Sequence, residues 1–131
     1  MITGAGIDVT PIARVARLIG AHREDIRRIL TAREQQACAA APARHRDGQY
    51  AAAFAAKEAV LKALGTGWRS DIEWSDIDTP PLRNGGLAGL SGGAAREAHR
   101  QGVARVFVSA AVTGDSAVAA AVAEGDEDAR P

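Results

Sequence analysis

The chain has little cysteine, few aromatic residues, no excess charge of either sign and no long apolar run. Its single cysteine, Cys38, excludes an internal disulfide framework. Sixteen basic residues balance sixteen acidic ones, so no overall field draws in nucleic acid or an anionic membrane. No apolar stretch approaches the roughly 20 residues that cross a bilayer. We therefore expect a soluble protein that binds neither nucleic acid nor membrane.

The length of 131 residues suits one compact domain with one site, or with one site shared between subunits. The start of the chain lacks a basic run followed by an apolar core, so no feature indicates export. A cytoplasmic location is the resulting expectation.

The clearest predicted helix covers residues 49–64, in which four apolar side chains form one stripe and Gly65 follows as the C-terminal cap. Residues 1–9 have the weak alternation of a short strand. Pro11 starts a predicted helix that Gly20 ends, and a short helical piece follows around residues 26–30. Thr31 and Glu34 have capping-box spacing at the start of a helix that ends near Ala41.

The second half of the chain alternates strand and helix patterns. We expect a strand at residues 74–77, a glycine-containing loop at 82–89, and a helix from Ser91 to about Gln101. Residues 103–111 and 117–123 form a predicted antiparallel hairpin. The charged residues 125–131 have no periodicity and are expected to fray. The fold class is therefore α+β, with one long helix packed on a small antiparallel sheet.

Three residues carry candidate chemistry. Glu58 and Lys62 are four residues apart, which places them one turn apart on the long helix. That spacing alone is typical of a helix-stabilising ion pair. Asp8, at the end of the first strand, alone is typical of a strand-end or N-cap aspartate, and the glycines at 65 and 67 alone are typical of a helix stop.

A longer motif changes this interpretation. The run FAAKEAVLKALGTG at residues 54–67 closely resembles the signature of the holo-acyl-carrier-protein synthase type of 4′-phosphopantetheinyl transferase. The opening GIDV at residues 6–9, WSDI at 74–77 and the closing hairpin are similar to further segments of that family. The resemblance spans nearly all of residues 2–124, so we expect one transferase domain at 1–124 and a disordered tail at 125–131.

The resemblance implies transfer of 4′-phosphopantetheine from coenzyme A to a serine of an acyl carrier protein, with Mg²⁺, releasing adenosine 3′,5′-bisphosphate. It assigns Asp8 and Glu58 to the metal, and hard carboxylate oxygens suit Mg²⁺. Lys62 can reach the phosphates, and Glu58 can accept the serine proton directly or through a metal-bound water. The family assembles as homotrimers with the active site at the subunit interface, and the same is expected here.

Two further contacts follow from the resemblance. Gly65, Thr66 and Gly67 are expected to offer backbone N–H groups to a phosphate. Arg14 falls where the family places a basic residue that meets the carrier. The surrounding helical region is basic, which would steer an acidic carrier toward it; the arginines are Arg14, Arg17, Arg23, Arg27 and Arg28.

The chain departs from the family pattern at three places. Ala53 stands where an arginine usually precedes the signature phenylalanine, and Ala111-Val112 replaces a Ser-His pair. Gly86-Leu87 replaces Lys-Pro or Arg-Pro. Two alternatives stay open: a scaffold that binds a carrier or a coenzyme A thioester without transfer, or a different reaction on a carrier-bound acyl chain. The carrier can be of fatty-acid or polyketide type.

Two other residue types carry weaker signals. The three histidines lack metal-ligand spacing and are expected at the surface. Cys38 has no evident base partner, so we interpret it as a packed residue rather than a nucleophile.

Overall fold

The computed structural model describes residues 1–21 and 24–126. His22, Arg23 and residues 127–131 of the expected tail lie outside the described residues. The elements in chain order are β1 (Ile2–Pro11), α1 (Ile12–Ala21), α2 (Ile26–Ile29), α3 (Ala32–Ala40), α4 (Ala43–Leu64), the 3₁₀-helix η1 (Trp74–Asp76), β2 (Ile77–Asp78), β3 (Gly86–Leu87), β4 (Gly89–Leu90), α5 (Gly92–Gln101), β5 (Val103–Thr113) and β6 (Ser116–Gly125).

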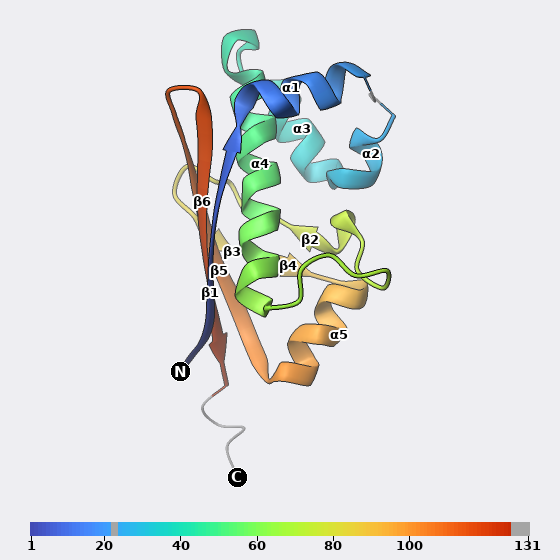
Figure 1. The fold of residues 1–131 in the computed structure, drawn as a ribbon, viewed down its shortest axis with the longest axis vertical. Helices are drawn as coiled ribbons and strands as arrows, with labels where there is room; N and C mark the ends of the chain where they lie inside the picture. The colour runs from blue at the N-terminus through green and yellow to red at the C-terminus, as the bar shows by residue number, and fades with distance from the viewer. Residues whose placement is uncertain (22–23, 127–131) are drawn as a thin grey trace.

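The predicted fold class is confirmed. A four-stranded antiparallel sheet has the order β1-β6-β5-β3, and β2 pairs with β4 in a separate two-stranded sheet. The long helix α4 runs along one face of the larger sheet, with α1, α2, α3 and α5 on its far side (Figure 1). The predicted β5–β6 hairpin is present. No helix of the described residues is both long enough and apolar enough to span a membrane.

Small residues let β1 lie directly on α4. A Cβ atom added to Gly4 would lie 2.0 Å from the carbonyl oxygen of Ala63, and one added to Gly6 would lie 2.2 Å from that of Ala59. Only glycine permits this approach, since real Cβ contacts are never so short. The glycines of the opening strand therefore bring Asp8 against the second half of α4.

The two faces of the sheet have different surroundings. The β6 residues that face α4 are all alanines and all buried: Ala117, Ala119, Ala121 and Ala123. The opposite face includes Ile7, Val9, Leu87 and Phe107, whose exposed fractions lie between 42% and 66%. This outer sheet face is apolar, and the rest of the described chain does not cover it.

Several element boundaries differ from the sequence prediction. Helix α4 begins at Ala43, six residues before the predicted start, and its first five residues are solvent-exposed, so they carry no apolar stripe that could mark them. The strand predicted at residues 74–77 is mostly η1, because the side chain of Asp76 accepts the Glu73 N–H and closes a turn. Gly86 and Leu87, predicted to be in a loop, form the edge strand β3. Gly125, predicted to belong to the tail, ends β6 and donates its N–H to the Met1 carbonyl.

The helix caps are partly as expected. The Thr31–Glu34 capping box is present, and Gly65 ends α4 at φ 72°. The expected Ser91 cap is wrong, because its hydroxyl makes no capping bond. Instead, the Asp76 carboxylate accepts the N–H groups of Gly93 and Ala94, which satisfies the first turn of α5 from a different element.

Candidate active site

Asp8 and Lys62 are in direct contact. The Lys62 Nζ atom lies 3.1 Å from Oδ1 of Asp8 and donates to the Ile7 carbonyl at 2.9 Å. The second oxygen of Asp8, Oδ2, accepts the Thr10 hydroxyl at 2.6 Å. Asp8 is therefore oriented by one donor from its own strand and one from α4. The Thr10 contact was missed because the predicted strand ends at residue 9, whereas β1 continues to Pro11 and places the side chains of residues 8 and 10 on one face.

Glu58 lies one helical turn before Lys62 and is half-buried. Its Oε1 atom accepts the indole N–H of Trp68 at 3.1 Å. Trp68 comes from the segment after α4 and was not a candidate from sequence. The only signal was its place directly after the Gly65-Thr66-Gly67 segment.

Three aromatic rings stand beside Glu58. Trp68 packs on Trp74 with ring centroids 3.6 Å apart, and Trp74 stacks on Phe54 at 4.6 Å. Phe54 precedes Glu58 by one turn on α4, whereas the two tryptophans lie beyond the helix end. The ring contacts thus pack residues 65–74 against the helix that carries Glu58 and Lys62.

The Gly65-Thr66-Gly67 segment closes α4. The Gly65 N–H bonds to the carbonyls of Leu61 and Lys62, and the Thr66 N–H bonds to the Leu61 carbonyl. These two donors complete the helix cap, so the expectation that all three N–H groups are available to a phosphate is wrong for Gly65 and Thr66. Gly67, at φ 59°, has the N–H group of this segment that no described residue accepts.

Helix α5 is hydrogen-bonded to the C-terminal end of α4. Gln101 donates to the Leu64 carbonyl at 2.6 Å and to Oε1 of Glu97 at 2.7 Å. Glu97 also accepts from Arg100 and from Arg69, which belongs to the segment after α4. The hydrogen bonds from Arg100, then that from Gln101, lower the pKa of Glu97 from 4.5 to about 2. Glu97 thus links the segment that carries Trp68 to α5.

A buried ion pair lies beneath the site. Lys57, the neighbour of Glu58, turns inward and contacts Glu34 of α3, and its Nζ atom also donates to the carbonyls of Trp74 and Ile77. Burial lowers the pKa of Lys57, while the Glu34 carboxylate opposes that shift. Lys57 therefore connects α3, α4 and η1. Lys57 and Glu58 are neighbours on the helix and point in different directions, so the Lys57 side chain is buried while that of Glu58 belongs to the candidate site.

Comparison with known proteins gives a family match that includes Asp8, Glu58 and Lys62. The family model for the 4′-phosphopantetheinyl transferase superfamily matches residues 4–121. The chain belongs to this superfamily. A holo-[acyl-carrier-protein] synthase from Desulforudis audaxviator is 40% identical over 99% of this chain and 98% of its own, and one from Geotalea daltonii is 36% identical over 95% and 99%. The expected family and the expected enzyme class, a 4′-phosphopantetheinyl transferase, are confirmed.

Solved structures of this superfamily share the fold. The holo-[acyl-carrier-protein] synthase of Neisseria meningitidis has a TM-score of 0.78 with 32% identity, covering 95% of this chain and 99% of its own. The holo-(acyl-carrier-protein) synthase of Bacillus anthracis, solved in complex with coenzyme A (3′,5′-ADP), has a TM-score of 0.76 with 28% identity, covering 96% and 99%.

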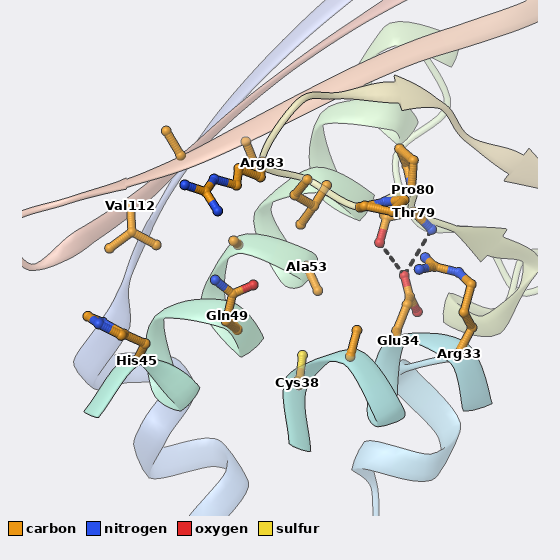
Figure 2. Close-up of a pocket in the computed structure, with 16 residues that line it drawn as sticks. Arg33, Glu34, Cys38, His45, Gln49, Ala53, Thr79, Pro80, Arg83 and Val112 are labelled. Carbon is orange, nitrogen blue, oxygen red and sulfur yellow. Dashed lines mark hydrogen bonds between the residues drawn. The ribbon is translucent and has the colours of Figure 1, made fainter. Parts of the chain in front are cut away.

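Two of the chain's departures from the superfamily pattern share one cavity. Ala53 of α4 and Val112 of β5 both line an open cavity of about 670 Å³, which Figure 2 shows in close-up. Arg83, His45 and Gln49 also border it. The third departure, Gly86-Leu87, lies in β3, where Leu87 adds an apolar side chain to the outer sheet face. Two positions that are 59 residues apart in sequence thus border one cavity.

Arg14 and Cys38, two further residues considered in the sequence analysis, differ in exposure. Arg14 is exposed on α1 and, with Arg17, borders a shallow hollow that reaches Phe54. Arg14 therefore lies near Phe54, the first residue of the signature run on α4. Cys38 is buried, and burial raises the pKa of its thiol to about 11, which fits a packed residue.

Proposed function

We propose that this protein transfers 4′-phosphopantetheine from coenzyme A to a serine of an acyl carrier protein, in a Mg²⁺-dependent reaction that releases adenosine 3′,5′-bisphosphate. The observation that carries the proposal is the contact of Asp8 with Lys62, one turn from Glu58, within a matching superfamily signature. The names of the relatives and the coenzyme A complex of the Bacillus anthracis protein support the choice of substrates.

In the proposed reaction, Glu58 accepts a proton and Lys62 offsets negative charge on the phosphates. The carrier serine hydroxyl attacks the β-phosphorus of coenzyme A, and its proton passes to the Glu58 carboxylate. The bond from the β-phosphorus to the bridging oxygen breaks, and that oxygen leaves with adenosine 3′,5′-bisphosphate. Lys62 is half-exposed, and among the described residues its ammonium bonds only to Asp8 and the Ile7 carbonyl, so it can turn to the phosphates and offset negative charge there.

The donor set fits Mg²⁺ rather than a tightly caged transition metal. Asp8 and Glu58 supply carboxylate oxygens, and no group of three or more histidine, cysteine, aspartate or glutamate side chains gathers among the described residues. Mg²⁺ characteristically takes one or two carboxylates and completes its shell with water and phosphate oxygens. When bound, the ion would neutralise charge on the pyrophosphate. Thr10 donates to Asp8 and Trp68 donates to Glu58, and these hydrogen bonds restrict the rotation of the two carboxylates that the proposal assigns to the metal.

A homotrimer is part of this proposal. The outer sheet face leaves Ile7, Val9, Leu87 and Phe107 in solvent, and an apolar face of this kind is typical of an interface between subunits. Asp8 alternates with Ile7 and Val9 along β1, so the same strand serves the site on one face and the interface on the other. We place the protein in the cytoplasm.

The alternative is a scaffold that binds a carrier or a coenzyme A thioester without transfer. The apolar side chains of Ala53, Ala111 and Val112 motivate it, because none of the three can donate a hydrogen bond to a phosphate, although Arg83 and His45 border the same cavity.

Intact-mass measurement of an apo carrier protein, incubated with the protein, coenzyme A and Mg²⁺, tests the choice. We expect a gain of one phosphopantetheine group on a fatty-acid or a polyketide carrier, lost in Asp8→Ala and Glu58→Ala and retained in the control Arg96→Ala, an exposed position on α5. No gain on any carrier, with the protein folded, would leave the scaffold.

A further inference from the structure

Trp68 is joined to Glu58 in two separate ways. Its indole N–H donates to Oε1 at 3.1 Å, and its ring packs against Trp74, which in turn stacks on Phe54 one turn before Glu58. The hydrogen bond and the ring stack therefore both connect residues 65–74 to the turn of α4 between Phe54 and Glu58.

The two oxygens of Glu58 have different surroundings as a result. Oε1 accepts the indole N–H, whereas Oε2 accepts no hydrogen bond within the part of the chain that the structure describes. A carboxylate with one fixed oxygen keeps one rotamer and presents the other oxygen in a set direction. Because the donor is neutral and cannot give up its proton near neutral pH, it orients Glu58 without competing for protons.

The arrangement parallels that of Asp8. Asp8 is held by a neutral hydroxyl, that of Thr10, and by Lys62, which can leave for a phosphate. Within residues 1–21 and 24–126, Glu58 has only the neutral indole donor. Asp8 and Glu58 thus each accept a hydrogen bond from one uncharged side chain, Thr10 or Trp68. The two donors belong to segments far apart in sequence.

We infer that Trp68 is a positioning residue for the transfer reaction, holding Oε1 of Glu58 so that Oε2 is directed to the metal and the serine proton. The inference rests on the proposed function. It assigns the indole N–H, rather than the bulk of the ring, as the group on which catalysis depends.

The chain offers a matched pair of variants. Trp68→Phe and Trp74→Phe each remove one indole from the same stack, but only Trp68→Phe removes the donor to Glu58. We expect Trp68→Phe to lower kcat and to weaken Mg²⁺ binding in the presence of coenzyme A by about tenfold, with the carrier KM unchanged. Trp74→Phe should change neither quantity by more than about twofold, while both variants unfold at a lower temperature.

Calorimetric titration of Mg²⁺ into the protein with coenzyme A and no carrier gives a readout independent of turnover. A double-mutant cycle with Glu58→Ala then separates the two roles of the ring. The loss of Mg²⁺ affinity caused by Trp68→Phe should disappear in the Glu58→Ala background, where no side-chain acceptor for the indole N–H remains. An equal loss in both backgrounds, or equal effects of the two tryptophan variants, would show that the ring acts only as structural support.

The wild-type transfer assay separates this inference from the proposed function. If the wild type transfers and Trp68→Phe matches it in kcat and in Mg²⁺ binding, the positioning role alone is overturned. If the wild type fails to transfer, the proposed function itself is overturned, and the positioning role falls with it.

Discussion

Lys57 and Glu34 form a salt bridge of 2.8 Å that is closed to solvent, with side-chain exposures of 0% and 2%. The remaining Glu34 oxygen accepts the backbone N–H and the hydroxyl of Thr79 at 3.0 and 2.5 Å. A buried charge is tolerated only when it is paired and hydrogen-bonded, and this pair meets both conditions. The ion pair that underlies the candidate site thus depends on elements from both halves of the chain.

Removal of one partner of this pair should destabilise the protein strongly. We expect Lys57→Met to lower the free energy of unfolding by about 3–5 kcal/mol, because it leaves the Glu34 carboxylate buried without its cation. Urea unfolding followed by circular dichroism measures the change. The control is Arg33→Ala, which breaks the exposed pair with Asp78 and should cost no more than about 1 kcal/mol. Similar small losses in both variants would contradict the importance of burial here.

Lys62 should matter for transfer and little for folding. Its side chain is 51% exposed, so Lys62→Met should change the free energy of unfolding by less than about 1 kcal/mol. We expect transfer to slow by about 100-fold, since the cation that offsets phosphate charge is lost. Carrier modification followed by mass spectrometry, beside thermal unfolding, checks both parts. Full activity in this variant would remove Lys62 from the reaction.

The outer sheet face should hold the subunits together. Light scattering after gel filtration is expected to give three times the chain mass for the wild type and one chain mass for Phe107→Asp, which places a charge in the apolar face. Arg96→Asp, an exposed change on α5, should leave the assembly intact. A monomeric wild type would contradict the trimer but not the chemistry of the site.

Glu97 should make stability depend on pH in the acid range. Its folded-state pKa is lowered from 4.5 to about 2, chiefly by hydrogen bonds from Arg100 and Gln101. A group of this kind contributes stability above pH 4.5, and that contribution is lost as the pH falls from about 4.5 toward 2. The gap in urea midpoint between the wild type and Glu97→Gln should therefore be larger at pH 6 than at pH 3. A gap that does not shrink at low pH would exclude this linkage.

Most elements were predictable because their signals are local. The Thr31 capping box, the Gly65 cap and the β5–β6 hairpin each depend on residues within a few positions of one another. The missed start of α4 and the missed 3₁₀ turn at Trp74 have other reasons. The first five residues of α4 are exposed and have no apolar stripe. The turn at Trp74 is closed by a local Asp76 contact to the Glu73 N–H, whose residues also fit a strand pattern, and the same carboxylate caps α5.

By itself, the sequence determined the fold class, the superfamily and the Glu58–Lys62 spacing, because helix period and a contiguous motif are properties of the chain alone. Only the tertiary structure decided which donors hold the carboxylates. Thr10 shares one face of β1 with Asp8 only because the strand continues past Val9. Lys62 reaches Asp8 because β1 lies directly on α4, and Trp68 reaches Glu58 beside the ring stack beyond the helix end. The last two contacts join residues that no sequence period relates, so packing alone could specify them.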